Sequence, residues 1–308
     1  MIYSVNEWDP IKEIVVGRAD YANWPGNDPV FSKESNKTTW KATPVPNGPV
    51  PDWIIDEANQ DLDILANTLE QYGAVVHRPK AINYQARSGM YGYCPRDRLF
   101  IYGSTIVDPA MMYPCRDMEI EALDDVVYKA DTVYRMPRND RYVMDAANAL
   151  RLNDKILYLE SVSGNYQAAH WLMRKFPEVK FEICNFYSGV HIDSTIVPLR
   201  EGLVLVNASR VNAEDNLPNI FNSWDVIWAT EDDIVEQDFY QYPYASKWIA
   251  LNMLVVDPNT VIVDKHQAKL IKILEKRKFT VIPLELRHSR TLGGGFHCVT
   301  LDLIRQTQ

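Results

Sequence analysis

The feature that most constrains the fold of this chain is a local pattern that recurs along it: strand, tight turn, strand, helix, strand. One example has predicted strands at 99–102 and 105–107 joined at Gly103, a helix over about 117–130 and a strand at 132–135. Apolar residues in short runs mark the strands, and apolar residues at helical spacing mark the helix. A unit that recurs every roughly 40 to 60 residues predicts a closed array of modules around an axis.

The same order of elements is expected along the rest of the chain. Strands are expected at 11–16, 75–77, 149–152, 156–159, 180–184, 194–198, 203–206, 225–228, 253–256, 261–264, 280–286 and 299–304, and helices over 54–69, 165–176 and 266–276. The segment 21–52, rich in Pro, Asn, Trp and Lys, predicts an extended surface loop. No linker divides the chain, so we expect residues 1–308 to form one α/β domain with internal pseudo-symmetry.

The composition argues against several classes of function. The net charge of -9 and the pI near 5.2 are not those of a nucleic-acid-binding surface. The four cysteines are far apart and form no CxxC pair, which argues against a zinc site and a disulfide framework. No segment approaches the roughly 20 apolar residues of a membrane span, and the first residues lack the features of a signal peptide. We expect a soluble cytoplasmic protein without nucleic-acid or membrane partners.

A thiol lies where a glycine-rich loop enters the last predicted strand. The loop is 293–295, three glycines in a row, followed by Phe296, His297 and Cys298. Such glycines disfavour helix and strand, and they let a backbone bend or pass close to another group. Cys298 is therefore either a nucleophile or a packing residue. Because adjacent residues of an extended segment face opposite ways, His297 is expected to be a packed histidine on the other side.

Two further positions combine a histidine with carboxylates. His191 and Asp193 precede the strand expected at 194–198, and in an extended segment their side chains point to one side. A histidine beside a carboxylate suits proton transfer, although a surface or capping role is the commoner one for such a triplet. Asp145 precedes the strand at 149–152 and could orient a histidine of another module; a turn or helix cap is the alternative.

Three more polar residues have both a functional and a structural interpretation. Asp97 could point into a central cleft or pair with Arg96 at the surface. Arg210, at the end of the strand 203–206, could hold a substrate carboxylate through two parallel hydrogen bonds or be a solvated strand end. Ser246 by itself is typical of a helix cap. No GxGxxG or other phosphate-binding loop occurs, so no nucleotide cofactor is expected.

Taken together, these positions resemble the arginine-dependent amidinotransferases, which include glycine amidinotransferase and inosamine-phosphate amidinotransferase. The match runs from Asn6 to Asp302, nearly the whole chain. The motifs that carry it are Pro95-Arg96-Asp97, Asp145-Ala146-Ala147-Asn148, His191-Ile192-Asp193-Ser194-Thr195, Ser246-Lys247-Trp248 and Thr291 through Cys298. The resemblance implies a propeller of five ββαβ modules around a central site, the pentein fold, which agrees with the repeat.

The resemblance also implies a role for each candidate residue. These are Cys298 as the nucleophile, His191 as the catalytic histidine, Asp145 as its partner, Asp97 and Asp193 as the acids that hold the guanidinium, Arg210 for the substrate carboxylate, and Ser246 and Thr291 at the substrate. The thiolate would attack the guanidinium carbon of arginine, release ornithine and pass the amidino group to an amine. Such a reaction requires no metal and no organic cofactor.

The acceptor amine is the open question. Glycine is the first expectation, and the product would then be guanidinoacetate; an inosamine phosphate or another amine comes next. The loop 187–190 lacks the Asn-Pro-Met of glycine amidinotransferase, which favours the inosamine enzymes. Two alternatives are an arginine hydrolase, in which water replaces the amine, and a guanidino-compound binder without catalysis. Small-molecule substrates are the expected partners, and whether the chain forms a homodimer stays open.

Overall fold

The computed structural model of the chain describes residues 1–35, 45–211 and 216–306. These residues form five three-stranded sheets and one two-stranded sheet. In each three-stranded sheet the central strand is antiparallel to one neighbour and parallel to the other. Because a parallel neighbour needs a crossover connection, each of these sheets is one module of the predicted repeat. The expected α/β class with five modules is confirmed.

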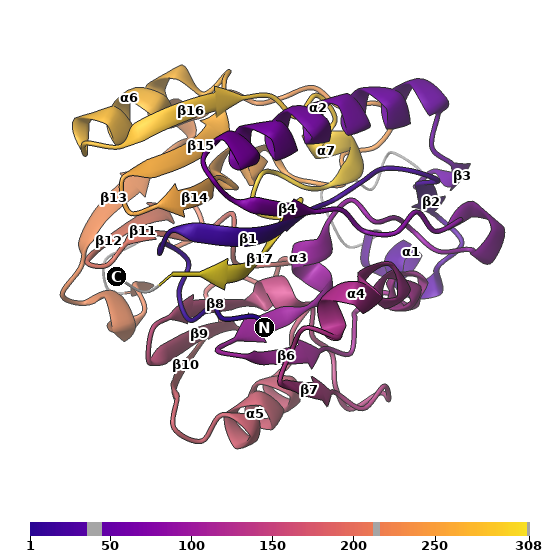
Figure 1. Cartoon of the computed structure of the whole chain (residues 1–308), viewed down its shortest axis with the longest axis horizontal. Coiled ribbons are helices and arrows are strands. Elements are labelled where there is room, and N and C mark those ends of the chain that lie inside the picture. The colour runs from indigo at the N-terminus through magenta and orange to yellow at the C-terminus, as the bar shows by residue number, and fades with distance from the viewer. Residues whose placement is uncertain (36–44, 212–215, 307–308) are drawn as a thin grey trace.

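The two ends of the chain share one module. β17 (Thr300–Arg305) is antiparallel to β1 (Ile11–Val16), and β4 (Val75–His77) is parallel to β1. Figure 1 shows β17 in yellow beside β1 in indigo. The crossover is α2 (Asp52–Gln71), whose residues at helical spacing are buried as expected. Pairing of the first strand with the last closes the array of modules.

The other four modules follow in chain order. Their strands are β5 (Phe100–Tyr102), β6 (Thr105–Asp108) and β7 (Thr132–Arg135); β8 (Ala149–Leu152), β9 (Lys155–Leu159) and β10 (Lys180–Cys184); β11 (Ile196–Arg200), β12 (Leu203–Asn207) and β13 (Asp225–Ala229); and β14 (Leu254–Asp257), β15 (Thr260–Asp264) and β16 (Thr280–Leu284). Every expected strand is present, and its ends lie within two residues of the expected ones.

The crossovers vary more than the strands. α5 (Tyr166–Lys175) and α6 (Ala268–Lys276) are the expected helices of their modules. Between β12 and β13 the described residues contain no α-helix; η5 (Asn219–Phe221) is a 3-10 turn, and residues 212–215 lie outside the described part. A helix in this unit was expected from the repeat, and that expectation is wrong for the described residues. There Trp224 packs edge-on against Trp8, with ring centroids 5.6 Å apart, so aromatic rings cover the sheet.

The crossover before β7 also differs from its prediction. A single α-helix over 117–130 was expected, but the segment is the 3-10 helix η2 (Pro114–Leu123) followed by the short α4 (Asp124–Val127). In a 3-10 helix, side chains three residues apart lie on one line. Arg116 and Glu119 have this spacing, are buried, and form a hydrogen-bonded pair at 2.9 Å.

The segment 21–52 is more ordered than the extended loop that was expected. It contains β2 (Asn23–Pro25), α1 (Pro29–Ser35) and β3 (Asn47–Pro49), and β2 and β3 form the two-stranded sheet. Asp28 caps α1, because its Oδ1 accepts from the N–H groups of residues 30 and 31 at 2.9 and 3.0 Å. Residues 36–44 of this segment lie outside the described part.

Short segments at equivalent places in the repeat lead into the first strand of each module. Three further short helices lie elsewhere between strands: η1 (Gln85–Arg87), η6 (Glu231–Asp233) and α7 (Ser289–Leu292). The five segments that lead into the modules are α3 (Pro95–Arg98), η3 (Ala146–Asn148), the turn 193–195, η7 (Lys247–Leu251) and the turn 296–299. Each of the five contacts the next, through backbone or side-chain bonds or packing. They therefore form a ring. Asp97, Asp193 and Cys298 lie in its segments, and Asp145 and Ser246 directly precede two of them.

Candidate active site

The Cys298 thiol lies in a turn and not in an extended strand. Residues 296–299 turn, and Asn252 Oδ1 accepts from the backbone N–H groups of His297 and Cys298, at 3.0 Å each. As a consequence the side chains of His297 and Cys298 do not point to opposite sides of the chain, and the prediction that they would is wrong. His297 Nδ1 and Cys298 Sγ both reach Asp193 Oδ2, at 2.8 and 3.4 Å.

The glycine triplet 293–295 passes close to other parts of the protein. A Cβ atom built on Gly294 would lie 2.4 Å from the Sγ atom of Cys94. One built on Gly295 would lie 2.7 Å from the Cβ atom of Asn252, the residue that holds the turn. Both separations are shorter than real Cβ contacts allow, so glycine is needed to bring this loop against its neighbours.

His191 is held between two carboxylates. Its Nε2 lies 3.0 Å from Asp145 Oδ2, and its Nδ1 lies 3.6 Å from Asp97 Oδ1. Asp145 is itself fixed, because its Oδ1 accepts from the backbone N–H of Met112 at 2.9 Å. Burial disfavours the imidazolium, but the charges of Asp97 and Asp145 outweigh it and raise the pKa of His191 to about 9. The ring therefore carries a proton at neutral pH and can act as a general acid.

The Asp97 carboxylate has one fixed oxygen and one open oxygen. Arg116 Nη1 donates to Oδ2 at 2.8 Å, and the same guanidinium is held by Glu119. Oδ1 is buried and has no hydrogen-bond partner among the described residues, although it faces His191. Because buried polar atoms are nearly always bonded, an open oxygen at this place indicates where a ligand N–H binds.

The groups beside the thiol have pKa values that are shifted in opposite directions. Burial raises the pKa of Asp193, but hydrogen bonding to His297 and nearby positive charge lower it to about 2, so this side chain is a carboxylate. Burial and the charges of Asp193 and Asp97 raise the pKa of the Cys298 thiol well above its usual range. A positive group between the two acids would offset their charges and favour the thiolate.

Arg210 provides a cationic group beside this cluster. Its Nη1 donates to the hydroxyls of Ser194 and Thr195, at 3.0 and 2.7 Å, and its Nη2 donates to Ser246 at 3.1 Å. No acidic side chain of the described residues forms an ion pair with it, and burial lowers its pKa. Ser194 and Thr195 directly follow Asp193, so this partly buried guanidinium, which has no ion pair among the described residues, lies beside the segment that carries Asp193.

The last two predicted site residues have different surroundings. Ser246 precedes η7 but makes no capping bond, and its hydroxyl bonds to Arg210 instead. The Thr291 hydroxyl is buried and accepts from the backbone N–H of Tyr240 at 3.0 Å. Among the described residues no bond links Thr291 to the cluster around Cys298, so the structure gives it a role in holding the segment near Tyr240.

Three contributors to the site have no local motif that marks them. Asn252 holds the turn of Cys298, Arg116 fixes Asp97, and the backbone of Met112 fixes Asp145. Each acts through a contact between segments distant in the sequence. Only the spacing of Arg116 and Glu119 could have suggested a buried pair.

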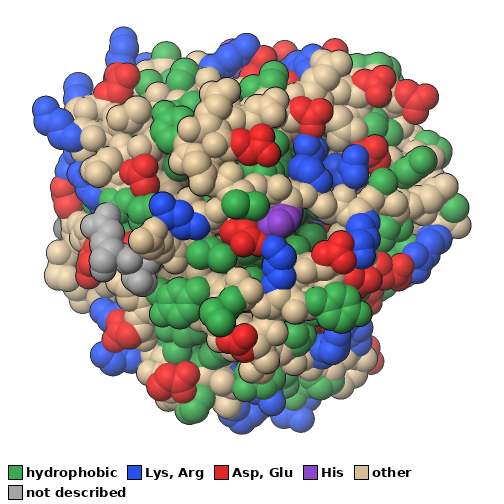
Figure 2. All heavy atoms as spheres, viewed as in Figure 1, with side chains coloured by type: hydrophobic (Ala, Val, Ile, Leu, Met, Phe, Trp, Pro, Cys, Tyr) green, Lys and Arg blue, Asp and Glu red, His purple; other side chains and the backbone are tan. Residues whose placement is uncertain are grey.

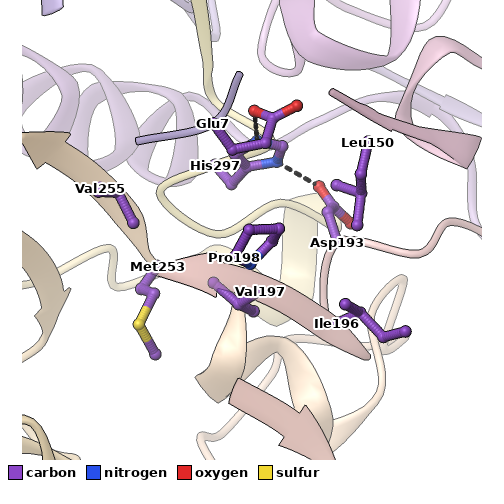
Figure 3. A pocket seen from close by; sticks show the side chains of 9 residues that line it. All are labelled: Glu7, Leu150, Asp193, Ile196, Val197, Pro198, Met253, Val255 and His297. Atoms are coloured by element: carbon purple, nitrogen blue, oxygen red, sulfur yellow. Dashed lines mark hydrogen bonds and ion pairs between the residues drawn. The ribbon is translucent and has the colours of Figure 1, made fainter. Parts of the chain in front are cut away.

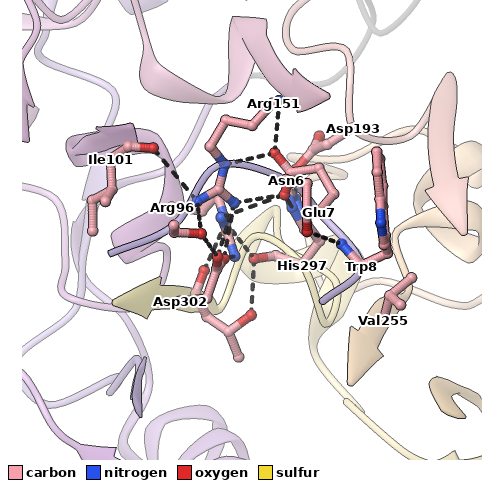
Figure 4. A network of polar contacts seen from close by, with 12 residues as sticks. Asn6, Glu7, Trp8, Arg96, Ile101, Arg151, Asp193, Val255, His297 and Asp302 are labelled. Carbon is pink, nitrogen blue, oxygen red and sulfur yellow. Dashed lines mark hydrogen bonds and ion pairs between the residues drawn. The ribbon is translucent and has the colours of Figure 1, made fainter. Parts of the chain in front are cut away.

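A buried ion cluster lies behind the ring. It consists of Glu7, Arg96, Arg151, Asp302 and Arg305, all of them buried (Figure 4). Arg151 Nη2 lies 2.6 Å from Glu7 Oε2 and 3.0 Å from Asp302 Oδ2, and Arg96 Nη2 lies 2.5 Å from Asp302 Oδ1. Arg96 also donates from its backbone N–H to the carbonyl of Cys298 at 3.4 Å. The cluster thus joins the N-terminal segment, α3, β8 and β17 under the site.

One face of the molecule and the described residues lack the features that a surface of one charge or a metal-binding site would show. Figure 2 shows acidic and basic side chains interspersed over one face, without a large patch of either sign. In residues 1–35, 45–211 and 216–306, no three His, Cys, Asp or Glu side chains are placed to hold a metal ion. The helices of this part of the chain are too short or too polar to cross a membrane.

The known proteins that are similar to this chain are amidinotransferases. No family profile matches the chain. It is 40% identical to inosamine-phosphate amidinotransferase 1 of Streptomyces glaucescens, over 97% of this chain and 95% of that one. It is 28% identical to mitochondrial glycine amidinotransferase of Xenopus tropicalis, over 99% and 83% of the two chains. The solved structure of inosamine-phosphate amidinotransferase from Streptomyces griseus superposes with a TM-score of 0.89 at 34% identity, covering 100% and 98%.

Proposed function

Since the chain belongs to the amidinotransferase family, we propose that it transfers the amidino group of L-arginine to a primary amine through a covalent amidino-cysteine. The observation that carries the proposal is the open oxygen of Asp97 together with the carboxylate of Asp193 beside the thiol of Cys298. A planar guanidinium cation, with N–H donors on its edges, suits two carboxylates around a nucleophile.

In the first half of the reaction the thiol attacks and ornithine leaves. Arginine, bound between Asp97 and Asp193, brings the positive charge that lowers the pKa of Cys298, and the thiol loses its proton to water as arginine binds. The thiolate adds to the guanidinium carbon, and the bond from that carbon to the side-chain nitrogen of the future ornithine breaks. His191, protonated at neutral pH, gives its proton to this departing amine. The amidino group remains on the sulfur.

In the second half the acceptor amine takes the place of ornithine. Neutral His191 removes a proton from the amine as it attacks the amidino carbon, and the carbon–sulfur bond breaks to regenerate the thiolate. Asp145 keeps the ring in place through both steps, since its carboxylate bonds to Nε2. The scheme predicts ping-pong kinetics.

For the acceptor we propose an amine that carries an anionic group, with an inosamine phosphate ahead of glycine. The relative that acts on inosamine phosphate is 40% identical, against 28% for glycine amidinotransferase. Arg210, which has no acidic partner among the described residues, could receive the carboxylate of arginine and then a phosphate or carboxylate of the acceptor. Glycine, the first expectation from the sequence, is thereby moved to second place.

An acceptor panel tests this function. The protein is incubated with L-arginine alone and with an aminocyclitol phosphate, its unphosphorylated form, glycine or lysine, and ornithine and guanidino products are measured by mass spectrometry. We expect ornithine release that depends on an acceptor, is fastest with the phosphorylated amine, and is absent in Cys298→Ala. Citrulline from arginine alone would instead identify a hydrolase, and unchanged arginine with every amine would identify a binder.

A further inference from the structure

His297 joins the acid Asp193 to the buried ion cluster. Its Nδ1 lies 2.8 Å from Asp193 Oδ2, and its Nε2 lies 3.5 Å from Glu7 Oε2. Figure 3 shows the imidazole between the two carboxylates. Glu7 is itself fixed by Arg151, whose Nε and Nη2 lie 2.9 and 2.6 Å from its two oxygens. The ring is therefore held from behind by charged groups that are buried and multiply bonded.

His297, Cys298 and Asp193 form one hydrogen-bonded unit. Asp193 Oδ2 accepts from both the imidazole and the thiol, and Asn252 bonds to the backbone of all three residues. The Asp193 carboxylate is thus tied through one oxygen to the imidazole and to the thiol.

A small cavity lies against this unit. It has a volume of about 10 Å³, which is room for about one water molecule. Glu7, Asp193 and His297 line its polar part, and apolar side chains such as Val197 and Met253 line the rest. If the imidazole were replaced by a smaller group, water could enter this space and take its place as the partner of Asp193.

We propose that His297 is a positioning residue: it holds the Asp193 carboxylate in the orientation that receives the guanidinium, and Glu7 of the buried ion cluster holds His297. The inference rests on the proposed function, because it assumes that Asp193 binds the guanidinium of arginine. His297 does not act as the acid or base of the reaction. Its Nδ1 is taken up by the 2.8 Å bond to Asp193 and its Nε2 faces Glu7 of the buried ion cluster, whereas Nδ1 of His191, 3.6 Å from Asp97 Oδ1, makes no hydrogen bond within the described residues.

Two substitutions of His297 separate its two contacts. The amide of His297→Asn can replace Nδ1 and keep the bond to Asp193, whereas His297→Gln can replace Nε2 and keep only the contact with Glu7. Both are made in a Cys298→Ala background, where arginine binds but does not react, and the dissociation constant of L-arginine is measured by calorimetry. His288→Asn is the matched control, since it removes a 2.8 Å contact of a buried histidine with Glu57 outside the site.

We expect His297→Gln to weaken arginine binding by about tenfold or more, because a charge-assisted hydrogen bond to Asp193 is lost. His297→Asn should recover most of the affinity, and His288→Asn should leave it unchanged. In the Cys298 enzyme, His297→Gln should lower kcat/KM for arginine by about 100-fold, since small displacements of a positioning group have effects of this size.

The possible outcomes separate this inference from the proposed function. Equal arginine affinity in the His297→Gln and His297→Asn variants would overturn the positioning role while leaving the proposed function intact. Greater loss in His297→Asn than in His297→Gln would overturn it too, because the contact with Glu7 would then matter more. If the Cys298→Ala protein itself does not bind arginine, the proposed function and this inference are both overturned.

Discussion

At the scale of single residues, each polar side chain of the candidate site is held in place by a partner from another segment of the chain. Asp97 is fixed by Arg116, Asp193 by His297, and His191 by Asp145. Fixed donors and acceptors are worth more than mobile ones, because they need no reorganisation when charge moves during the reaction. The same residues set the protonation states on which the mechanism depends.

The charge of His191 leads to a prediction about pH. Its pKa of about 9 means that kcat/KM for arginine falls as pH rises through that value, because the departing amine then lacks its proton donor. Asp145→Asn removes one of the three carboxylates that raise this pKa. We expect the falling limb of the profile to move to lower pH and kcat/KM at neutral pH to drop by about 100-fold. A limb that stays in place would show that another group titrates.

The raised pKa of His191 also affects stability. Since the folded pKa lies above the ordinary value of 6.5, the protonated ring contributes stability that is fully present below that value. The contribution is lost as pH rises through about 9. Asp145→Asn should therefore reduce the difference in unfolding free energy between neutral and alkaline solution.

At the scale of elements, the five segments that precede the first strands of the modules determine what the site can contain. The turn 296–299 places His297 and Cys298 on the same carboxylate, which an extended segment could not do. The turn depends on close approach of the glycine triplet to its neighbours.

The crowding around Gly294 gives a prediction for this element. A methyl group there would lie 2.4 Å from Cys94 Sγ, so we expect Gly294→Ala to lower the unfolding free energy by about 1–3 kcal/mol and to lower activity. Adding Cys94→Ala to this variant removes the clashing sulfur. The double variant should recover part of the stability in urea unfolding, and failure to recover any would assign the loss to backbone strain instead.

These elements also show what sequence alone can predict. The strands were predicted well because runs of apolar residues are a local signal. The structure also brings together Asp97, Asp145 and His191, which the sequence motifs singled out. The helix expected between β12 and β13, and the partners Asn252 and Arg116, depend on contacts between distant segments. Such contacts leave no periodic pattern in the chain, so local reasoning missed them.

At the scale of the whole molecule, the buried ion cluster joins the modules at their centre. Asp302 of β17 contacts Arg96 of α3, Arg151 of β8 and Arg305. Burial opposes its ionisation, but the charges of these arginines hold the pKa of Asp302 well below its usual range. Its stabilising contribution is therefore present above the ordinary pKa of an aspartate and is lost only in strong acid.

Removal of the negative charge of Asp302 should lower the stability of the whole protein. Asp302→Asn leaves three buried arginines with one fewer carboxylate, and we expect the unfolding free energy to fall by about 3–5 kcal/mol. The exposed pair of Asp225 with Arg277 is the control, since Asp225→Asn should change stability by less than about 1 kcal/mol. We propose that residues 1–308 behave as one domain, so both variants should unfold in one transition. Two separate transitions would contradict that proposal.

The central claim is that Cys298 carries the amidino group, and peptide mass spectrometry tests it most directly. The protein is mixed with L-arginine in the absence of an amine, quenched in acid and digested. The account predicts a mass increase of one amidino group on the peptide that contains Cys298, released ornithine in equal amount, and loss of the adduct when an acceptor amine is added. Ornithine and guanidino product formed at full rate in a Cys298→Ala variant, or an adduct on Cys94, Cys115 or Cys184 instead, would contradict it.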